Sequence, residues 1–363
     1  MTFPRIAIAG AGLSGLACAR VLQLHGLEVT VFEQESAAGA RPQGGTLDLH
    51  GDTGQVALRT ARLDEQFRAL ARPEGQQMRG VDPHTAEVVM DDTPDGDFRP
   101  EIDRGQLRGI LLDSLSPGTV HWGRPLADVT RAGRLTFADG VSEDFDLVVG
   151  ADGAWSRVRR ALTGVRPEYS GVTFVEFGLD DADRRHPALA ALTGQGTMMT
   201  KIGGRALVAQ RTSSGHIRCY ATFYAPEGWA TGLDFADSTA VRDHLLERYA
   251  GWHPDLLAYL REHDGGFTHR PLHVLPVPHA WTSTPRLTLL GDAAHLMPPL
   301  GVGANLALLD GTELATALAT APSAEEAVRV YEAGMLPRSI ETAKACASGL
   351  HDLLSDDLRS MAA

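Results

Sequence analysis

The chain opens with a short apolar segment, residues 5–9, that runs directly into a glycine-rich turn. Residues 16–24 follow as an Ala-, Leu- and Val-rich helix, and a second apolar strand over 28–33 ends at the acidic residue Glu33. Strand, glycine turn, helix and strand in this order predict a βαβ unit at the start of a doubly wound α/β fold.

The turn carries Gly10, Gly12 and Gly15 in the spacing G-x-G-x-x-G. The first glycine permits a tight turn, the second lets the backbone approach a pyrophosphate, and the third lets the helix pack on the strand. A carboxylate such as Glu33 binds a ribose diol and repels a 2′-phosphate, which favours NAD or FAD over NADP. The fingerprint does not choose between NAD and FAD, and a glycine-rich turn without a ligand is the weaker alternative.

Apolar spacing predicts a helix over 52–70 and a hairpin over 76–90. Asp103 is placed to cap the helix that follows. Arg104, in the first turn of that helix, opposes the helix dipole. An anionic ligand nearby would remove this conflict, and a plain surface arginine explains it equally well.

Two later strands also end in loops that precede helices. Short strands and turns alternate over 119–149, and the last strand runs into Gly150-Ala-Asp-Gly153. The strand 287–290 ends at Gly291-Asp292, and a Pro- and Gly-rich loop leads to a helix near Gly303. Both are crevices of the kind in which doubly wound sheets bind ligands.

Residues 166–274 are dominated by strand-like runs at 172–179, 197–212 and 216–224, with a helix over 239–250. Alternation in the third run places polar and aromatic side chains on one face and apolar side chains on the other. A solvated face and the floor of a ligand cavity explain this pattern equally well. If it is a floor, the candidates for substrate contact are Arg211, His216, Arg218, Tyr220 and Tyr224.

Composition narrows the classes of partner. A length of 363 residues favours two domains, and a net charge of −13 opposes binding to nucleic acid or anionic membranes. Cys18, Cys219 and Cys346 lie too far apart for a C-x-x-C redox or zinc site, so no metal is expected. No signal peptide and no uncharged apolar run of membrane-spanning length is found, so we expect a cytoplasmic protein with a small-molecule substrate.

Three spaced motifs together resemble one enzyme family. They are Gly10 to Gly15, Gly150-Ala-Asp-Gly153 and Gly291-Asp-Ala-Ala-His-Leu-Met-Pro-Pro299, and in this order they resemble the single-component FAD-dependent aromatic hydroxylases. Residues 44–50, Gly-Gly-Thr-Leu-Asp-Leu-His, and the third motif look especially like the tetracycline-inactivating flavin monooxygenases. The resemblance runs nearly end to end. It implies a Rossmann-like FAD-binding domain of the para-hydroxybenzoate-hydroxylase type with an inserted β-sheet substrate domain and C-terminal helices.

The resemblance also implies a division of the chain and roles for particular residues. The FAD-binding domain would comprise residues 1–75, 97–165 and 275–363, and the substrate domain residues 76–96 and 166–274. The ADP half of FAD would be bound by the glycines and Glu33. The remaining cofactor contacts implied by position are Asp292 to the ribityl region, Pro299, Gly303 and Asn305 along the isoalloxazine, Asp48 and Arg104 to the flavin, and Arg41 to the nicotinamide cofactor. His295, inside the third motif, fits a structural hydrogen bond better than a catalytic role.

By the same resemblance, NAD(P)H would reduce non-covalently bound FAD and leave. The reduced flavin would react with O2 to form a C4a-hydroperoxide that hydroxylates an aromatic or polycyclic phenol or enol, as in tetracycline inactivation. Two departures weaken the finer assignment: the loop 300–305 is one residue shorter than usual, with Val302 between its glycines, and the segment 190–224 lacks recognisable drug-binding residues. The alternative is another FAD-dependent oxidoreductase, or a flavin-binding protein without hydroxylation.

Overall fold

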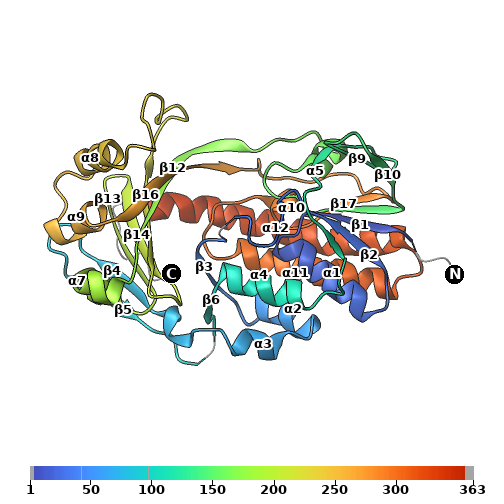
Figure 1. The fold of residues 1–363 in the computed structure, drawn as a ribbon, viewed down its shortest axis with the longest axis horizontal. Coiled ribbons are helices and arrows are strands. Elements are labelled where there is room, and N and C mark those ends of the chain that lie inside the picture. The colour runs from blue at the N-terminus through green and yellow to red at the C-terminus, as the bar shows by residue number, and fades with distance from the viewer. Residues whose placement is uncertain (1–3, 42, 97, 356–363) are drawn as a thin grey trace.

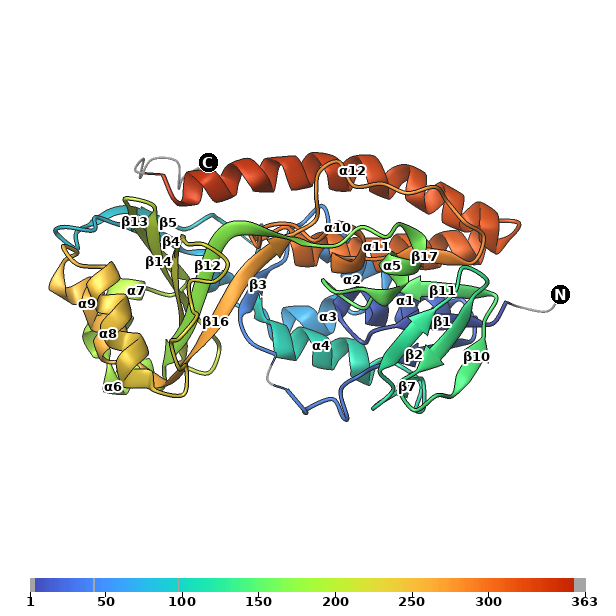
Figure 2. The same cartoon turned by 90° about the horizontal axis from the view of Figure 1, so that it is seen from above.

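The computed structural model of the chain describes residues 4–41, 43–96 and 98–355. Two sheets dominate it, one at each end of an elongated molecule (Figure 1). The long helix α12 (Ala324–Leu353) lies along one side and reaches from the first sheet toward the second (Figure 2). Among the described residues, no helix is both long and apolar enough to cross a bilayer.

The first sheet is five-stranded, parallel and fully buried at its centre. Its order is β17 (Leu287–Leu289), β11 (Leu147–Gly150), β1 (Ile6–Ala9), β2 (Val29–Phe32) and β7 (Val120–His121). Helix α1 (Leu13–Leu24) packs on it, and α11 (Gly303–Thr320) packs on α1. A Cβ at Gly311 would stand 2.3 Å from the carbonyl oxygen of Ser14, so this glycine permits the close approach of α11 to α1.

The second sheet is seven-stranded and mixed. Its order is β16 (Asp264–Val274), β12 (Glu168–Leu179), β15 (Ile217–Tyr224), β14 (Arg205–Arg211), β13 (Thr197–Ile202), β4 (Met78–Val81) and β5 (Val88–Asp92). One face packs on helices α7 (Pro187–Thr193), α8 (Ser238–Arg248) and α9 (Pro254–Arg261) through an apolar core. The other face is turned toward the first sheet, and the C-terminal end of α12 packs on it through Leu350 and Leu354.

The remaining elements connect these layers. A two-stranded antiparallel ribbon of β3 (Thr46–Asp48) and β6 (Glu101–Asp103) lies between the two sheets. The other elements are α2 (Gly54–Thr60), α3 (Asp64–Arg68), η1 (Pro73–Gln76), α4 (Arg104–Asp113), β8 (Leu126–Val129), β9 (Arg134–Phe137), β10 (Ser142–Asp144), α5 (Arg157–Leu162), α6 (Ala182–Arg185) and α10 (Asp292–His295).

Most predicted elements are present, and two local predictions are wrong. The helix expected over 52–70 is two short helices, because the chain turns between them at Arg62 with φ of 56°. Asp103 stands at the N-cap position of α4, but its carboxylate accepts hydrogen bonds from Ser213 instead of from the helix. The Asp103 carboxylate therefore does not cap α4, because it is bound to Ser213, a residue distant in the sequence.

Candidate active site

A cavity of about 700 Å³ lies between the two sheets. Its walls come from three sources: the loops at the ends of the first sheet's strands, the β3–β6 ribbon, and the free face of the seven-stranded sheet. Representative lining residues are Gly12, Ser14 and Asp292 from the first, Asp48 and Glu101 from the second, and Glu176, Gln210 and Tyr220 from the third. The sequence-predicted crevices therefore open into one space.

The glycine turn forms one end of this cavity. Gly10 has φ of 105°, and a Cβ there would stand 2.3 Å from the carbonyl oxygen of Ala151, so only glycine fits. Gly12 is the N-cap of α1, which has no side-chain cap and no acidic residue in its first turn. Open space surrounds the position of a Cβ on Gly12. Uncapped N–H groups beside open space fit a pyrophosphate.

The acid at the end of β2 is bound to this turn. One carboxylate oxygen of Glu33 accepts from the Ala11 N–H at 2.7 Å, and the other accepts from the Glu35 N–H at 2.9 Å. Arg108 was missed by sequence reasoning and also binds the turn, donating to the carbonyl of Ala11 at 3.0 Å and to Glu35 at 3.2 Å. The available signal was a cation one turn after Arg104 on the same helix.

The guanidinium of Arg104 and the carboxylate of Asp292 line the cavity and have no hydrogen-bond partner among the described residues, and the same holds for the guanidinium of Arg99. Burial lowers the pKa of Arg104, and the nearby Asp292 charge opposes that shift. A cation and an anion that both face open space suit a ligand with phosphates and hydroxyls, as FAD has. Arg41 instead is exposed, pairs with Glu35 at 2.8 Å and does not line the cavity.

The loop before α11 forms another part of the wall. Pro299, Gly301 and Gly303 line the cavity, and Asp48 faces them from β3, with a carboxylate oxygen 3.2 Å from the position of a Cβ on Gly301. Asn305 departs from the prediction, because it is buried and does not line the cavity. Its amide donates to the carbonyls of Asp48 and Gly301 and accepts from the backbone N–H of His50, in the loop after β3, and from that of Gly54, the first residue of α2. All its bonding capacity is used to hold the two loops together.

The seven-stranded sheet contributes the opposite wall. Tyr220 lines the cavity, and burial raises its pKa to about 12, so its hydroxyl stays neutral. Directly across the ladder stands Glu176, which pairs with Arg218 on one oxygen and with Arg270 at 3.1 Å on the other. Glu176 and Arg270 line the cavity, whereas Arg218 does not, and its guanidinium lies beside Gly44.

The other sheet candidates do not line the cavity. The prediction that Arg211 contacts the substrate is wrong. Arg211 pairs with Ile217 across the ladder and so lies on the helix-covered face of the sheet. There its guanidinium binds Asp183 and the carbonyl of Gly194. His216 pairs with Asp180 at 2.8 Å, and Tyr224 is 45% exposed near His351. Alternation sorts residues within one strand, but the pairing register decides which residues of neighbouring strands share a face.

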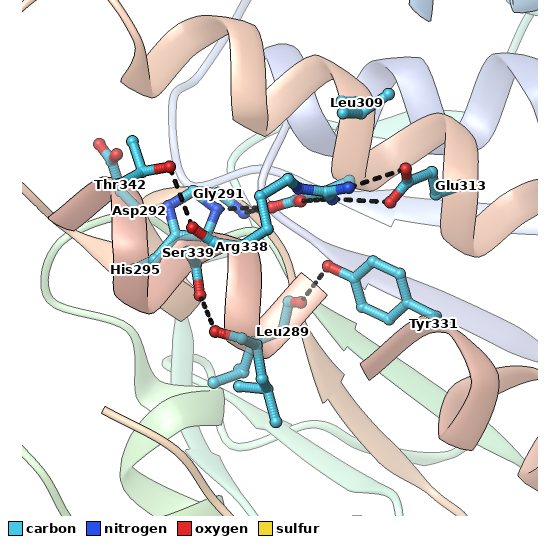
Figure 3. Close-up of polar contacts among 12 residues, drawn as sticks. Leu289, Gly291, Asp292, His295, Leu309, Glu313, Tyr331, Arg338, Ser339 and Thr342 are labelled. Carbon is cyan, nitrogen blue, oxygen red and sulfur yellow. Dashed lines mark hydrogen bonds and ion pairs between the residues drawn. The ribbon is translucent and has the colours of Figure 1, made fainter. Parts of the chain in front are cut away.

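A buried ionic network supports the strand end that carries Asp292 (Figure 3). Asp310 on α11 accepts from the Gly291 N–H at 3.1 Å, contacts His295 Nε2 at 2.6 Å and pairs with Arg338 at 3.2 Å. Burial acts to lower the pKa of His295, but the Asp310 charge and hydrogen bond outweigh it and raise that pKa overall. His295 therefore has the structural role expected for it.

Comparison with known proteins identifies the family. Residues 8–62 match the NAD(P)-binding Rossmann-like domain, and residues 277–339 match the FAD binding domain. The monooxygenase asqM of Emericella nidulans is 31% identical over 372 residues, which cover 86% of this chain and 83% of that protein. The chain belongs to the FAD-dependent aromatic monooxygenases. Another member, 3-amino-4-hydroxybenzoate 2-monooxygenase PtnB3 of Streptomyces platensis, is 33% identical over 92% of this chain and 85% of its own length.

Solved structures show the same fold. HpxO of Klebsiella pneumoniae, solved in complex with FAD and uric acid, superposes on this chain with a TM-score of 0.83 at 21% identity. The match covers 99% of this chain and 91% of the HpxO chain. The tetracycline destructase Tet(55) superposes with a TM-score of 0.76 at 21% identity, and the match covers 98% of this chain and 91% of the Tet(55) chain. The fold of this monooxygenase is thus the α/β fold of the para-hydroxybenzoate-hydroxylase type, and its cofactor is FAD.

Proposed function

We propose that this monooxygenase hydroxylates an aromatic or polycyclic phenol or enol, with NAD(P)H and O2 as co-substrates and FAD held without a covalent bond. The observation that carries the proposal is the single cavity that connects the glycine turn to the polar face of the seven-stranded sheet. A cofactor bound at the turn and a substrate lying on the sheet would share this one space. None of the three cysteines lines it, which supports a non-covalent cofactor.

FAD, once reduced, supplies the activated oxygen, and the residues of the chain bind, orient and exclude water. The glycine turn and the N-terminus of α1 would hold the pyrophosphate, with Glu33 beside the ribose. Arg104 and Asp292, both without partners among the described residues, would bind the phosphate and ribityl groups. Asp48, Pro299 and Gly303 would border the isoalloxazine, while Asn305 holds their loops in place.

The sheet wall supports a planar substrate with an ionisable hydroxyl. Phe174 and Met199 offer apolar surface, and Tyr220 offers a neutral hydroxyl. Arg270 is 58% exposed and uses one N–H on Glu176, so it has donors left for an anionic group. The relative PtnB3 is named for a hydroxybenzoate, which supports aromatic hydroxy acids as the first class to test. Tetracycline-type enols are the second class, on the likeness to Tet(55).

NAD(P)H would visit from solvent and leave after reduction, because the sequence has no second glycine fingerprint to retain it. The exposed position of Arg41 supports its proposed role in that transient contact.

We also propose that residues 1–75, 97–165 and 275–363 form the FAD-binding domain and residues 76–96 and 166–274 the substrate domain. The pairing of β4 with β13, and of β5 with β4, supports including 76–96 with the sheet.

The test is a screen of NAD(P)H consumption by the purified yellow protein over hydroxybenzoates, other phenols and tetracyclines, with mass detection of a product one oxygen heavier. Each active phenol is paired with its methyl ether, which has the same ring but no ionisable hydroxyl. We expect faster NAD(P)H oxidation and an oxygenated product with the phenol alone. If no phenol or enol gives an oxygenated product, or if the ethers react equally well, the proposed substrate class is wrong.

A further inference from the structure

Glu101 lies at the seam between the two halves of the cavity. It belongs to β6, pairs with Asp48 of β3 across the ribbon, and lines the cavity. A Cβ at Gly75 would stand 2.8 Å from the Cβ of Glu101, and a Cβ at Gly196 would stand 2.4 Å from the carbonyl oxygen of Gly75. This packing links Glu101 through Gly75 to Gly196, which directly precedes β13, and Gly75 and Thr197 line the cavity together with Glu101.

The carboxyl is held on one side only. Oε2 of Glu101 accepts a hydrogen bond from the hydroxyl of Thr46, which in turn accepts from Nη2 of Arg72 at 3.4 Å. Oε1 has no hydrogen-bond partner in the described part of the chain, and Glu101 makes no ion pair there. The residue is 8% exposed, and it lines the cavity.

The surroundings of Glu101 place the pKa of its carboxyl near neutral pH. Burial is the largest effect and raises the pKa of Glu101 to about 7, with the Asp48 charge adding to the rise. The Thr46 hydrogen bond and the charges of Arg72 and Arg99 oppose it. A carboxyl whose pKa lies near the working pH can both take up and release a proton. Arg72 directs its Nη2 to Thr46 and to the carbonyl of Arg211, so it does not neutralise Glu101 directly.

We propose that Glu101 is a catalytic residue that accepts the hydroxyl proton of the bound phenol or enol. This inference rests on the proposed function. The substrate O–H bond breaks, an O–H bond forms on Oε1 of Glu101, and the electron pair stays on the substrate oxygen as phenolate or enolate, so no oxidant or reductant takes part. The ionised ring is more electron-rich and reacts faster with an electrophilic oxygen. Thr46 is a positioning residue, because its hydroxyl holds Oε2 and leaves Oε1 toward the cavity.

The proposal predicts that the need for Glu101 depends on the acidity of the substrate. For a phenol that is neutral at the assay pH, Glu101→Gln should lower kcat/KM by about 100-fold or more, the usual range for a lost acid–base group. For a nitro-substituted phenol that is already ionised at that pH, the same variant should change kcat/KM little. Wild-type kcat/KM for the neutral phenol should rise with pH through an apparent pKa near that of Glu101, and the variant should lack this rise.

A readout that does not depend on turnover is the infrared band of the protonated carboxyl in the FAD-loaded protein. We expect a band that titrates near neutral pH in the wild type and is absent from Glu101→Gln. Thr46→Val removes a hydrogen bond that favours the anion, so it should move both the band and the rise in kcat/KM to higher pH. Glu74→Gln removes an exposed carboxylate from the same segment as Gly75 and is the matched control, with wild-type behaviour expected.

The outcomes separate the two claims. If the wild type oxygenates no phenol or enol, the proposed function fails, and this inference fails with it. If the wild type oxygenates phenols but Glu101→Gln affects neutral and ionised phenols equally, or if no neutral-pH carboxyl band is lost, the inference alone is overturned.

Discussion

Replacing Asp310 should loosen the strand end that presents Asp292 to the cavity. The Asp310 side chain is fully buried on α11 and binds the Gly291 N–H, His295 and Arg338. Gly291 precedes Asp292 and has φ of 55°, so the Asp310 carboxylate holds an unusual backbone turn at the cavity wall. Arg338 also pairs with Glu313 through two contacts, at 2.9 Å and 2.7 Å, and keeps that partner in any Asp310 variant.

The expected magnitude follows from these contacts. Asp310→Ala leaves a buried histidine and a buried N–H without partners, and breaking a buried ion pair by removing one charge costs about 3–5 kcal/mol. Asp310→Asn keeps the shape and one acceptor oxygen, so it should lose about 1.5–3 kcal/mol, the usual value of a hydrogen bond to a charged group. Arg338 adds little to either figure because it is half-buried and keeps Glu313.

The pH dependence gives a second, independent check. The folded-state pKa of His295 is raised, so its pairing with Asp310 stabilises the fold fully below the unfolded pKa of about 6.5. This contribution is lost as the pH rises through the folded-state pKa. The difference in stability between the wild type and Asp310→Asn should therefore narrow at alkaline pH.

The assay is denaturant unfolding of the FAD-free and FAD-loaded proteins at pH 6 and pH 9, together with flavin absorbance per protein after purification. We expect both Asp310 variants to unfold at lower denaturant and to retain less flavin, with Ala worse than Asn. Asp128→Asn removes an exposed aspartate of β8 and serves as the control. If both Asp310 variants stay within about 0.5 kcal/mol of the wild type, as a neutral surface change would, and retain full flavin, the network does not support the site.

Three further predictions concern the cofactor and the sheet. Asp292→Ala should weaken FAD binding about 10- to 100-fold, because about 1.5–3 kcal/mol of charge-assisted hydrogen bonding is lost. The far-UV circular dichroism should be unchanged, and undiminished flavin content would count against the proposed contact of Asp292 with FAD. Tyr220→Phe should raise KM or uncouple NAD(P)H oxidation from oxygenation with FAD still bound, whereas unchanged coupling and KM would place the substrate elsewhere. Acid precipitation should release the yellow flavin into the supernatant, and colour kept in the pellet would indicate a covalent link.

Much of the fold could be predicted from local patterns. The βαβ unit around Gly10 is one example, because turn geometry, phosphate approach and helix packing each require glycine at a set spacing. The hairpin of β4 and β5 is another, since its strand and turn residues are adjacent in sequence. The helix expected over 239–250 is present as α8, and its cap is local too, because the Asp237 carboxylate accepts from the Ala240 N–H at 3.0 Å.

Other features were decided only by contacts between distant segments. Asp103 was predicted to cap α4, but its carboxylate instead accepts a hydrogen bond from Ser213, which lies far along the chain. Asn305 follows the flavin-motif loop in sequence, yet its amide is fully hydrogen-bonded to backbone groups, three of which belong to the distant segment 48–54. Glu101 gave no signal in the sequence, because its chemistry comes from burial beside Asp48 and Thr46, and burial is a property of the packed molecule.

The two arginines Arg211 and Arg218 illustrate the same limit within one sheet. The sequence by itself determined that Arg218, Tyr220 and Thr222 share a face, because side chains alternate strictly along a strand. It did not determine whether Arg211 on the neighbouring strand shares that face. The pairing of Arg211 with Ile217 decided this, and a shift of one residue in that register would have placed Arg211 on the cavity side. Which side chains of one strand share a face follows from the local sequence, whereas the register between strands depends on which residues the whole fold buries.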